Sequence, residues 1–395
     1  MINEKLWSWW FAKQGLDGSL AGASPKAVLE KSGWARTVGG SNPYIALFAR
    51  AGIGKAQAEQ SVADLQIHEL PSARGCTYLI PKSDYALALI AAQGTGSKPG
   101  LSGVEKSLGV TEEELDRLMA MVLDALAKGA LDSRGLRQSL GGAVRSLGDE
   151  GKKKGVVSTL PSALGRLQAV GKIRRVPVDG RLDHERYAYA LWRPSPLDGS
   201  SLTFDEAMAE LAKKYFRWIG PATAKQFQAF AGIGVKATQS ALDAIGLMPI
   251  EPGSDYLICG DELDDFKAHR PPSKPQYSLV SSLDSIVLLR RDSASVVAQE
   301  DAGREVYGEK TTTSVGGLQD LPSHGIFDRG RLIGLWEFDP SVGKIERTLF
   351  VPEDAVLKAK IVEMERFVRD EIGDARSFSL DSPASREPRL AALRS

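Results

Sequence analysis

Cysteine and histidine are both scarce in this chain. Its 395 residues include two cysteines, Cys76 and Cys259, and four histidines. Two distant thiols exclude a disulfide framework and a multi-thiolate metal site, and we expect both to be buried and inert. None of the histidines has a second His or Cys at metal-ligand spacing, so we expect no metal and no cofactor.

Long apolar runs are also absent. No stretch reaches the roughly 18 residues that cross a bilayer as a helix. The first residues, MINEKLWSWWFAKQGLDGS, place Lys13 and three tryptophans where a secretory signal needs a clean apolar segment. We therefore expect a cytoplasmic protein, a monomer, with no membrane partner.

The chain has no overall excess of one charge, but its middle does. Fifty Lys and Arg balance fifty Asp and Glu, whereas the window 134–186 holds twelve basic residues against five acidic ones. Such a concentration favours a polyanionic partner. The alternative is a well-solvated surface whose lysines maintain solubility.

Helix-start signals recur along the chain. A capping side chain precedes proline at Ser24-Pro25 and Asn42-Pro43, while Thr111, Thr203 and Thr223 each have Glu or Gln three residues later. The tetrapeptide Ala-Gly-Ile-Gly occurs twice, at 51–54 and 231–234, between two amphipathic segments. Glycine allows the positive φ that a helix-turn-helix reversal needs, which indicates a repeated unit.

Each of three helical stretches is followed by a predicted strand pair, at 65–81, 173–192 and 247–259. Helices followed by a two-stranded wing, three times over, predict an α+β fold of tandem winged helices, followed by a small antiparallel β-barrel-like domain and a C-terminal helix. The predicted boundaries are 1–92, 100–195 and 203–262 for the winged helices, 276–351 for the β-rich domain, 352–371 for the helix and 376–395 for a disordered tail.

Basic residues cluster on the predicted recognition helix and wing of the middle unit, where cations can meet DNA phosphates. Further candidates lie at the wing of the first unit. The predicted DNA-binding residues are Arg74, Lys82, Arg166, Lys172, Arg174, Arg175 and Arg181.

Four strings in a fixed order resemble the landmarks of AlkZ/YcaQ-like winged-helix DNA glycosylases. They are NPYIALFAR (42–50), ARGCTYLIP (73–81), GPAT (220–223) and GRLIGLW (330–336). The resemblance spans roughly residues 5–350. It implies three winged helices and a β-barrel around a basic concave face for double-stranded DNA, with excision of alkylated or crosslinked purines as the activity.

The resemblance fails at the catalytic motif. Active members carry Gln-Φ-Gln or Gln-Φ-Asp just before the helix that starts at Asn42, whereas this chain reads ARTVGGSN at 35–42. The two polar positions become Arg36 and Val38 without a gap, or Gly39 and Ser41 with a shift. Neither pair can orient water and stabilise an oxocarbenium-like sugar as a carboxamide or carboxylate does.

Replacement catalytic groups would have to come from the matching segments, where the candidates are Ser41, Asn42, His68 and Tyr78. Gln226-Phe227-Gln228 spells the motif elsewhere, but Gln226 can close a capping box with Thr223, so we interpret it as structural. Asn42 is likewise interpreted first as a helix cap.

Three functions fit these observations. The first is a DNA repair protein of the glycosylase fold with altered or absent activity. The second is a non-enzymatic DNA-binding or regulatory protein on the same scaffold. The third is an interaction protein that does not bind nucleic acid, and the clustered basic charge favours the first two.

Overall fold

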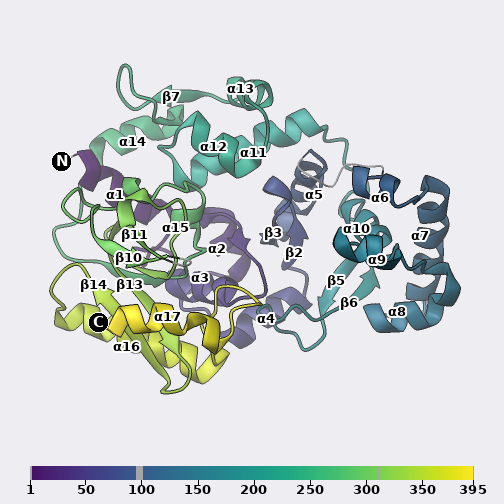
Figure 1. Cartoon of the computed structure of the whole chain (residues 1–395). Coiled ribbons are helices and arrows are strands. Elements are labelled where there is room, and N and C mark those ends of the chain that lie inside the picture. The colour runs from purple at the N-terminus through teal and green to yellow at the C-terminus, as the bar shows by residue number, and fades with distance from the viewer. Residues whose placement is uncertain (1, 95–100, 309–310, 395) are drawn as a thin grey trace.

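The computed structural model describes residues 2–94, 101–308 and 311–394 (Figure 1). The outermost residues 1 and 395 and the boundary at Gly100 used in the predicted ranges lie outside them. In these described ranges, short helices alternate with small sheets whose paired strands are all antiparallel. The predicted α+β class is confirmed.

The first unit surrounds a three-stranded sheet of order β1-β3-β2. Its elements are α1 (Ile2–Lys13), α2 (Pro25–Ser32), β1 (Ala35–Arg36), α3 (Asn42–Ala51), α4 (Lys55–Ala63), β2 (Ile67–Pro71), β3 (Thr77–Pro81) and α5 (Tyr85–Gln93). Gly52 ends α3 with φ 68°, the left-handed conformation that the repeated tetrapeptide predicts.

The middle unit stands at one end of the molecule, beside β2, β3 and α5 (Figure 1). Its elements are α6 (Gly103–Ser107), α7 (Glu112–Leu126), β4 (Leu131–Asp132), α8 (Ser133–Leu140), α9 (Gly148–Lys153), α10 (Leu160–Ala169), β5 (Ile173–Pro177) and β6 (Tyr187–Leu191). Thr111 accepts a hydrogen bond from the backbone N–H of Glu114, so the predicted cap of α7 is present.

The third unit repeats the plan of the first. Its elements are α11 (Phe204–Ile219), α12 (Ala224–Ala231), α13 (Val235–Asp243), β7 (Leu247–Pro249), β8 (Leu257–Cys259) and α14 (Leu263–Ala268). Thr203 and Thr223 both form the predicted capping boxes, and Gly232 ends α12 with φ 71°.

The C-terminal region is built on an open sheet of order β14-β13-β12-β9. Its elements are β9 (Tyr277–Val280), α15 (Ser285–Leu288), β10 (Glu305–Tyr307), β11 (Thr312–Ser314), β12 (His324–Asp328), β13 (Arg331–Asp339), β14 (Lys344–Leu349), α16 (Ala355–Phe367) and α17 (Pro383–Arg394). The predicted barrel-like closure is wrong, because β9 and β14 remain unpaired edges among the described strands. Helices α16 and α17 cover the sheet instead.

The tail is ordered, contrary to the predicted disorder of 376–395. Helix α17 occupies residues 383–394 and buries Leu390 and Leu393. Arg386 is fully buried and pairs with Asp374 at 2.9 Å. The Ser, Arg and Pro composition misleads here, because the arginines of α17 find carboxylate partners that are distant in sequence.

A buried ion pair joins the first unit to the C-terminal region. The two Nη atoms of Arg50, in α3, each donate to a carboxylate oxygen of Asp284 at 2.7 Å, and Nη2 also donates to Gln14 at 2.9 Å. Both charged side chains are at most 1% exposed. Bidentate geometry offsets the large cost of removing these charges from water.

We expect Arg50→Met to lower the free energy of unfolding by about 3–5 kcal/mol, because Asp284 keeps a buried charge without its partner. Urea-induced unfolding measures the change. Lys360→Met is the control, since Lys360 and Glu363 form an exposed pair that contributes about 0–1 kcal/mol. An Arg50→Met variant as stable as the control variant would contradict the central role of the pair.

Candidate functional site

The sheet of the first unit fixes the side chain that occupies the first motif position. Arg36 pairs with Tyr78 across β1 and β3, so both side chains lie on one face of the sheet. The Arg36 guanidinium lies 5.6 Å from the centre of the Tyr78 ring. Its Nη1 donates to the carbonyls of Thr77 at 2.8 Å and Thr37 at 3.3 Å. The described hydrogen bonds thus hold the guanidinium in place and use only one of its three nitrogens.

Two more arginines affect the ionisation of Tyr78. Arg74 has the left-handed φ of 58° and packs against Gly232 of the third unit, where a Cβ would lie 2.7 Å from its Cγ. Arg291 follows α15 and pairs with Asp320 at 2.6 Å. Burial raises the pKa of Tyr78, while the positive charges of Arg36, Arg74 and Arg291 lower it, so all three guanidinium groups act on the phenol. We call Arg36, Arg74 and Arg291 the arginine cluster.

Arg36 and Arg291 were not among the predicted DNA-binding residues, whereas Arg74 was. In the sequence, Arg36 stands out only as one of the two lost motif positions. The Arg290-Arg291 doublet in the sequence is a signal for the second residue, but its effect on Tyr78 depends on the packing of the C-terminal region against the first unit.

The predicted catalytic candidates do not converge on one accessible group. Ser41 is completely buried, and its hydroxyl donates to the carbonyl of Arg376 at 3.0 Å. Asn42 lies inside α3 rather than capping it, and its Nδ2 donates to the carbonyl of Arg36 at 2.7 Å. The cap interpretation of Asn42 is therefore wrong, because the N-cap position falls on Ser41.

His68 and Tyr78 are also buried. The His68 ring packs edge-on against Trp192 at 5.3 Å, and neither ring nitrogen has a hydrogen-bond partner among the described residues. Burial lowers the pKa of His68 to about 3, with Arg174 and Arg175 adding to the effect. A neutral, enclosed imidazole of this kind packs the junction between the first and middle units and is poorly placed to transfer a proton.

Several predicted DNA-binding residues are engaged within the protein. Arg166 pairs with Glu112 at 2.5 Å. Arg181 is bound to both carboxylate oxygens of Asp183 and to the carbonyl of Ile372. These two arginines serve the internal structure in this conformation.

The remaining basic candidates are more accessible. Lys82 and Lys172 are exposed, and neither amine has an ion-pair partner in the part of the chain that the structure describes. Arg174 is half-buried, and burial lowers its pKa. The Arg175 guanidinium lies 5.2 Å from the centre of the Tyr187 ring.

The sequence interpretation missed Glu69 on β2. Glu69 is 5% exposed, and its Oε1 has no hydrogen-bond partner among the described atoms. Burial raises the pKa of Glu69 to about 7, against the opposing influence of the Thr37 and Tyr187 hydroxyls and of Arg175. A carboxylate within the apolar strand sequence IHELP is the signal that could have identified it.

The raised pKa of Glu69 predicts that the free energy of unfolding depends on pH. Its pKa in the folded protein lies above the ordinary value of 4.5, so between these values the folded state binds more protons than the unfolded state, and stability falls as pH rises from about 4.5 to 7. We expect Glu69→Gln to raise the melting temperature at pH 8 and to have little effect at pH 4.5. Thermal unfolding at both pH values measures this, and an equal shift at both would contradict it.

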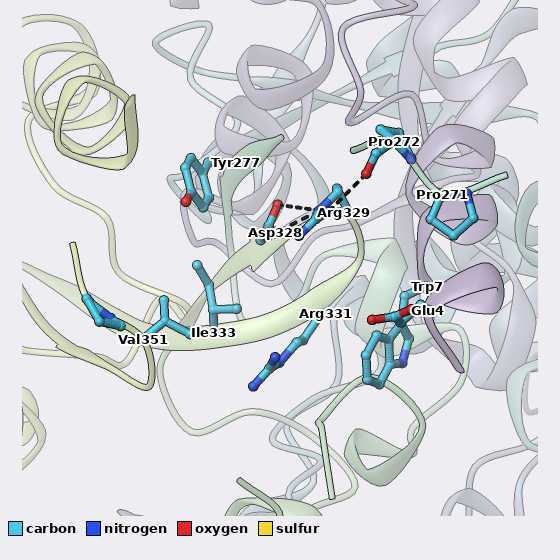
Figure 2. Close-up of a pocket in the computed structure, with 11 residues that line it drawn as sticks. Glu4, Trp7, Pro271, Pro272, Tyr277, Asp328, Arg329, Arg331, Ile333 and Val351 are labelled. Carbon is cyan, nitrogen blue, oxygen red and sulfur yellow. Dashed lines mark hydrogen bonds and ion pairs between the residues drawn. The ribbon is translucent and has the colours of Figure 1, made fainter. Parts of the chain in front are cut away.

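A separate cavity of about 570 Å³ lies between α1, the linker at Pro271-Pro272 and the C-terminal sheet (Figure 2). Arg329 at its wall pairs with Asp328, and Arg331 pairs with Glu300 and Asp301. Since these guanidinium groups already have carboxylate partners, we do not assign the cavity to the nucleic-acid interface.

Among the described residues, no cluster of three or more His, Cys, Asp or Glu side chains is arranged to hold a metal ion. No helix in the same part of the chain has the length and apolar character to span a membrane.

The comparisons with known proteins identify the class. The family model described as "DNA glycosylase AlkZ-like" matches residues 36–367, which is most of the chain. The protein therefore belongs to the AlkZ-like DNA glycosylase family.

A solved structure supports the fold. The DNA glycosylase AlkZ of Streptomyces sahachiroi superposes with a TM-score of 0.67 at 19% sequence identity, covering 94% of this chain and 97% of that one. At this identity the likeness concerns the fold. A search of curated proteins found no match.

Proposed function

We propose that this protein binds duplex DNA, including DNA with alkylated or crosslinked purines, and that it excises such bases feebly or not at all. Family membership supports a DNA substrate. The observation that carries the proposal is the fixed guanidinium of Arg36 where the resemblance places the first catalytic carboxamide. A non-enzymatic DNA-binding or regulatory role on the same scaffold is the alternative.

The three helical units are proposed to act as winged helices. In the first and third units a left-handed glycine joins two helices, and a short antiparallel strand pair follows. In the middle unit, α10 leads directly into β5 and β6. Each unit thus has a helix pair and a hairpin of the kind that contacts DNA grooves and phosphates.

We place the protein in the cytoplasm as a monomer.

The arginine cluster suits the backbone of DNA better than base cleavage. A guanidinium can donate two parallel hydrogen bonds to a phosphate, and it carries no acceptor that could orient water. Two carbonyls already fix Arg36, which reduces the entropy lost on binding. Lys82, Lys172 and Arg174 are proposed to extend this contact along the first and middle units.

We expect the double variant Arg36→Gln, Arg74→Gln to weaken binding to duplex DNA, and Arg291 is left unchanged because Asp320 already pairs with it. Each lost phosphate contact lowers the slope of log K against log salt by roughly 0.9. Fluorescence anisotropy over a salt series measures both quantities. The matched control removes two positive charges from α16, as Lys358→Gln, Arg366→Gln. Equal losses in the two variants would move the DNA surface away from the cluster.

Excision is tested with duplex DNA that contains 7-methylguanine, followed by alkali and gel electrophoresis. We expect the wild-type protein to be close to spontaneous depurination, because a missing charge-stabilising group costs roughly 10²–10³ in rate. The variant Arg36→Gln, Val38→Gln restores two carboxamides and is expected to excise faster at saturating protein.

Each other outcome of the excision and binding experiments would point to a different site or function. Robust wild-type excision that is lost on changing Ser41, Asn42, His68 or Tyr78 would assign catalysis to that residue. Excision lost only at Gln226 or Gln228 would assign it to the third unit, although Gln226 closes the capping box with Thr223. Absence of any DNA binding would favour an interaction protein instead.

A further inference from the structure

The C-terminal segment 376–382, which we call the strap, crosses the loop at 38–41. The backbone N–H and the hydroxyl of Ser41 both donate to the carbonyl of Arg376, at 2.8 and 3.0 Å. The backbone N–H of Ser379 donates to the carbonyl of Val38 at 3.0 Å. The strap therefore binds the loop that includes the second position of the missing motif.

Two glycines make this contact possible. A Cβ at Gly40 would lie 2.2 Å from the carbonyl oxygen of Ser377, and one at Gly39 would lie 2.7 Å from the Cβ of Ser379. The first clash is with backbone, which cannot rotate away as a side chain can. Loop and strap are thus in contact at a distance that only glycine permits.

The strap also holds the turn of the middle unit at 179–186. The Arg376 guanidinium donates to the carbonyl of Asp183 at 2.7 Å, and the Ser379 hydroxyl donates to the Glu185 carboxylate at 2.8 Å. One segment therefore links the loop of the first unit to the hairpin that carries the basic residues of the middle unit. In Figure 1 the yellow chain before α17 runs toward α4 in this way.

The strap is attached by polar contacts, whereas the elements beside it are anchored more firmly. Phe378 is 43% exposed and Leu380 is 91% exposed, so these large side chains contribute little apolar burial. Each of these hydrogen bonds replaces one to water, so its net contribution to stability is small. In contrast, α17 buries Leu390 and Leu393, and Arg389 pairs with Glu337 at 3.1 Å.

The family match ends at residue 367, so the strap and α17 lie outside the matched segment. Gly373 has φ 81° and ends the π-helical turn Val368–Ile372 that follows α16. The strap thus begins three residues after this left-handed glycine and ends where the anchored helix α17 begins.

We propose that the strap is an autoinhibitory segment that must leave loop 38–41 and turn 179–186 before duplex DNA can bind fully. This inference rests on the proposed DNA binding and names its regulation. The bound strap hides loop 38–41 and fixes the middle unit against the first, so its release exposes the loop and frees the hairpin.

The first test uses two variants that loosen the strap from opposite sides. Gly40→Ala introduces the clash with Ser377, and Ser379→Pro removes the N–H that binds Val38. Gly303→Ala is the matched control, because a Cβ there meets nothing within 4 Å. We expect both strap variants to bind duplex DNA roughly tenfold more tightly than wild type by fluorescence anisotropy, since a closed state lowers the apparent affinity in proportion to its population.

The second test follows the backbone amides by hydrogen exchange in the wild-type protein. Saturating duplex DNA is expected to speed exchange at Ser41 and Ser379, although bound DNA usually protects amides. Slower or unchanged exchange there, or strap variants that bind no tighter than Gly303→Ala while wild type binds DNA, would overturn the autoinhibition alone. Absence of binding by wild type and by both strap variants would refute the proposed function, and the autoinhibition with it.

Discussion

The ion pair between Arg50 and Asp284 is the constraint on which the arrangement of the units depends. Arg50 lies in the last turn of α3, and α3 starts immediately after loop 38–41, so the pair fixes that loop relative to the C-terminal region. Gln14 belongs to the same buried hydrogen-bond network. Its side-chain NH₂ group donates to the carbonyls of Ser32 and Trp218, and its side-chain oxygen accepts from Arg50. Every partner is buried and hydrogen-bonded, so a displacement of one element would leave a charge or an amide unsatisfied.

The features that could be predicted from the sequence are those whose physical cause is local. A Thr with Glu or Gln three residues later satisfies its own helix start, which is why the caps at Thr203 and Thr223 are present. Gly52 and Gly232 have the positive φ that the repeated tetrapeptide implies. The strand pairs of all three units also follow from local signals, namely alternating apolar residues and turn residues. The α+β class and most element positions could therefore be predicted from the sequence.

The errors arise where a residue's partner is far away in the chain. The tail is ordered because Arg389 forms an ion pair with Glu337 and the Arg386 side chain is fully buried. The sequence of residues 376–395 contains no signal for these distant partners. Arg181 is predicted to bind DNA, but the carbonyl of Ile372, which is distant in sequence, accepts a hydrogen bond from its guanidinium while the neighbouring Asp183 pairs with it. The arginine cluster is the reverse case, since Arg36 and Arg291 act on the same phenol, Tyr78, although they are far apart in the sequence.

The same long-range packing decides what the former motif position can do. Hydrogen bonds from Nη1 to the Thr37 and Thr77 carbonyls fix Arg36, and the Tyr78 ring lies beneath its guanidinium. A carboxamide at that position could accept a hydrogen bond from water and direct it at a sugar, whereas a guanidinium has donors only. A carboxamide at this position would favour the proton of a water molecule, whereas the Arg36 guanidinium favours an anionic oxygen. Under the proposed function, such an exchange would preserve attraction for the DNA backbone while removing a group that hydrolysis requires, so binding and base excision would be separable.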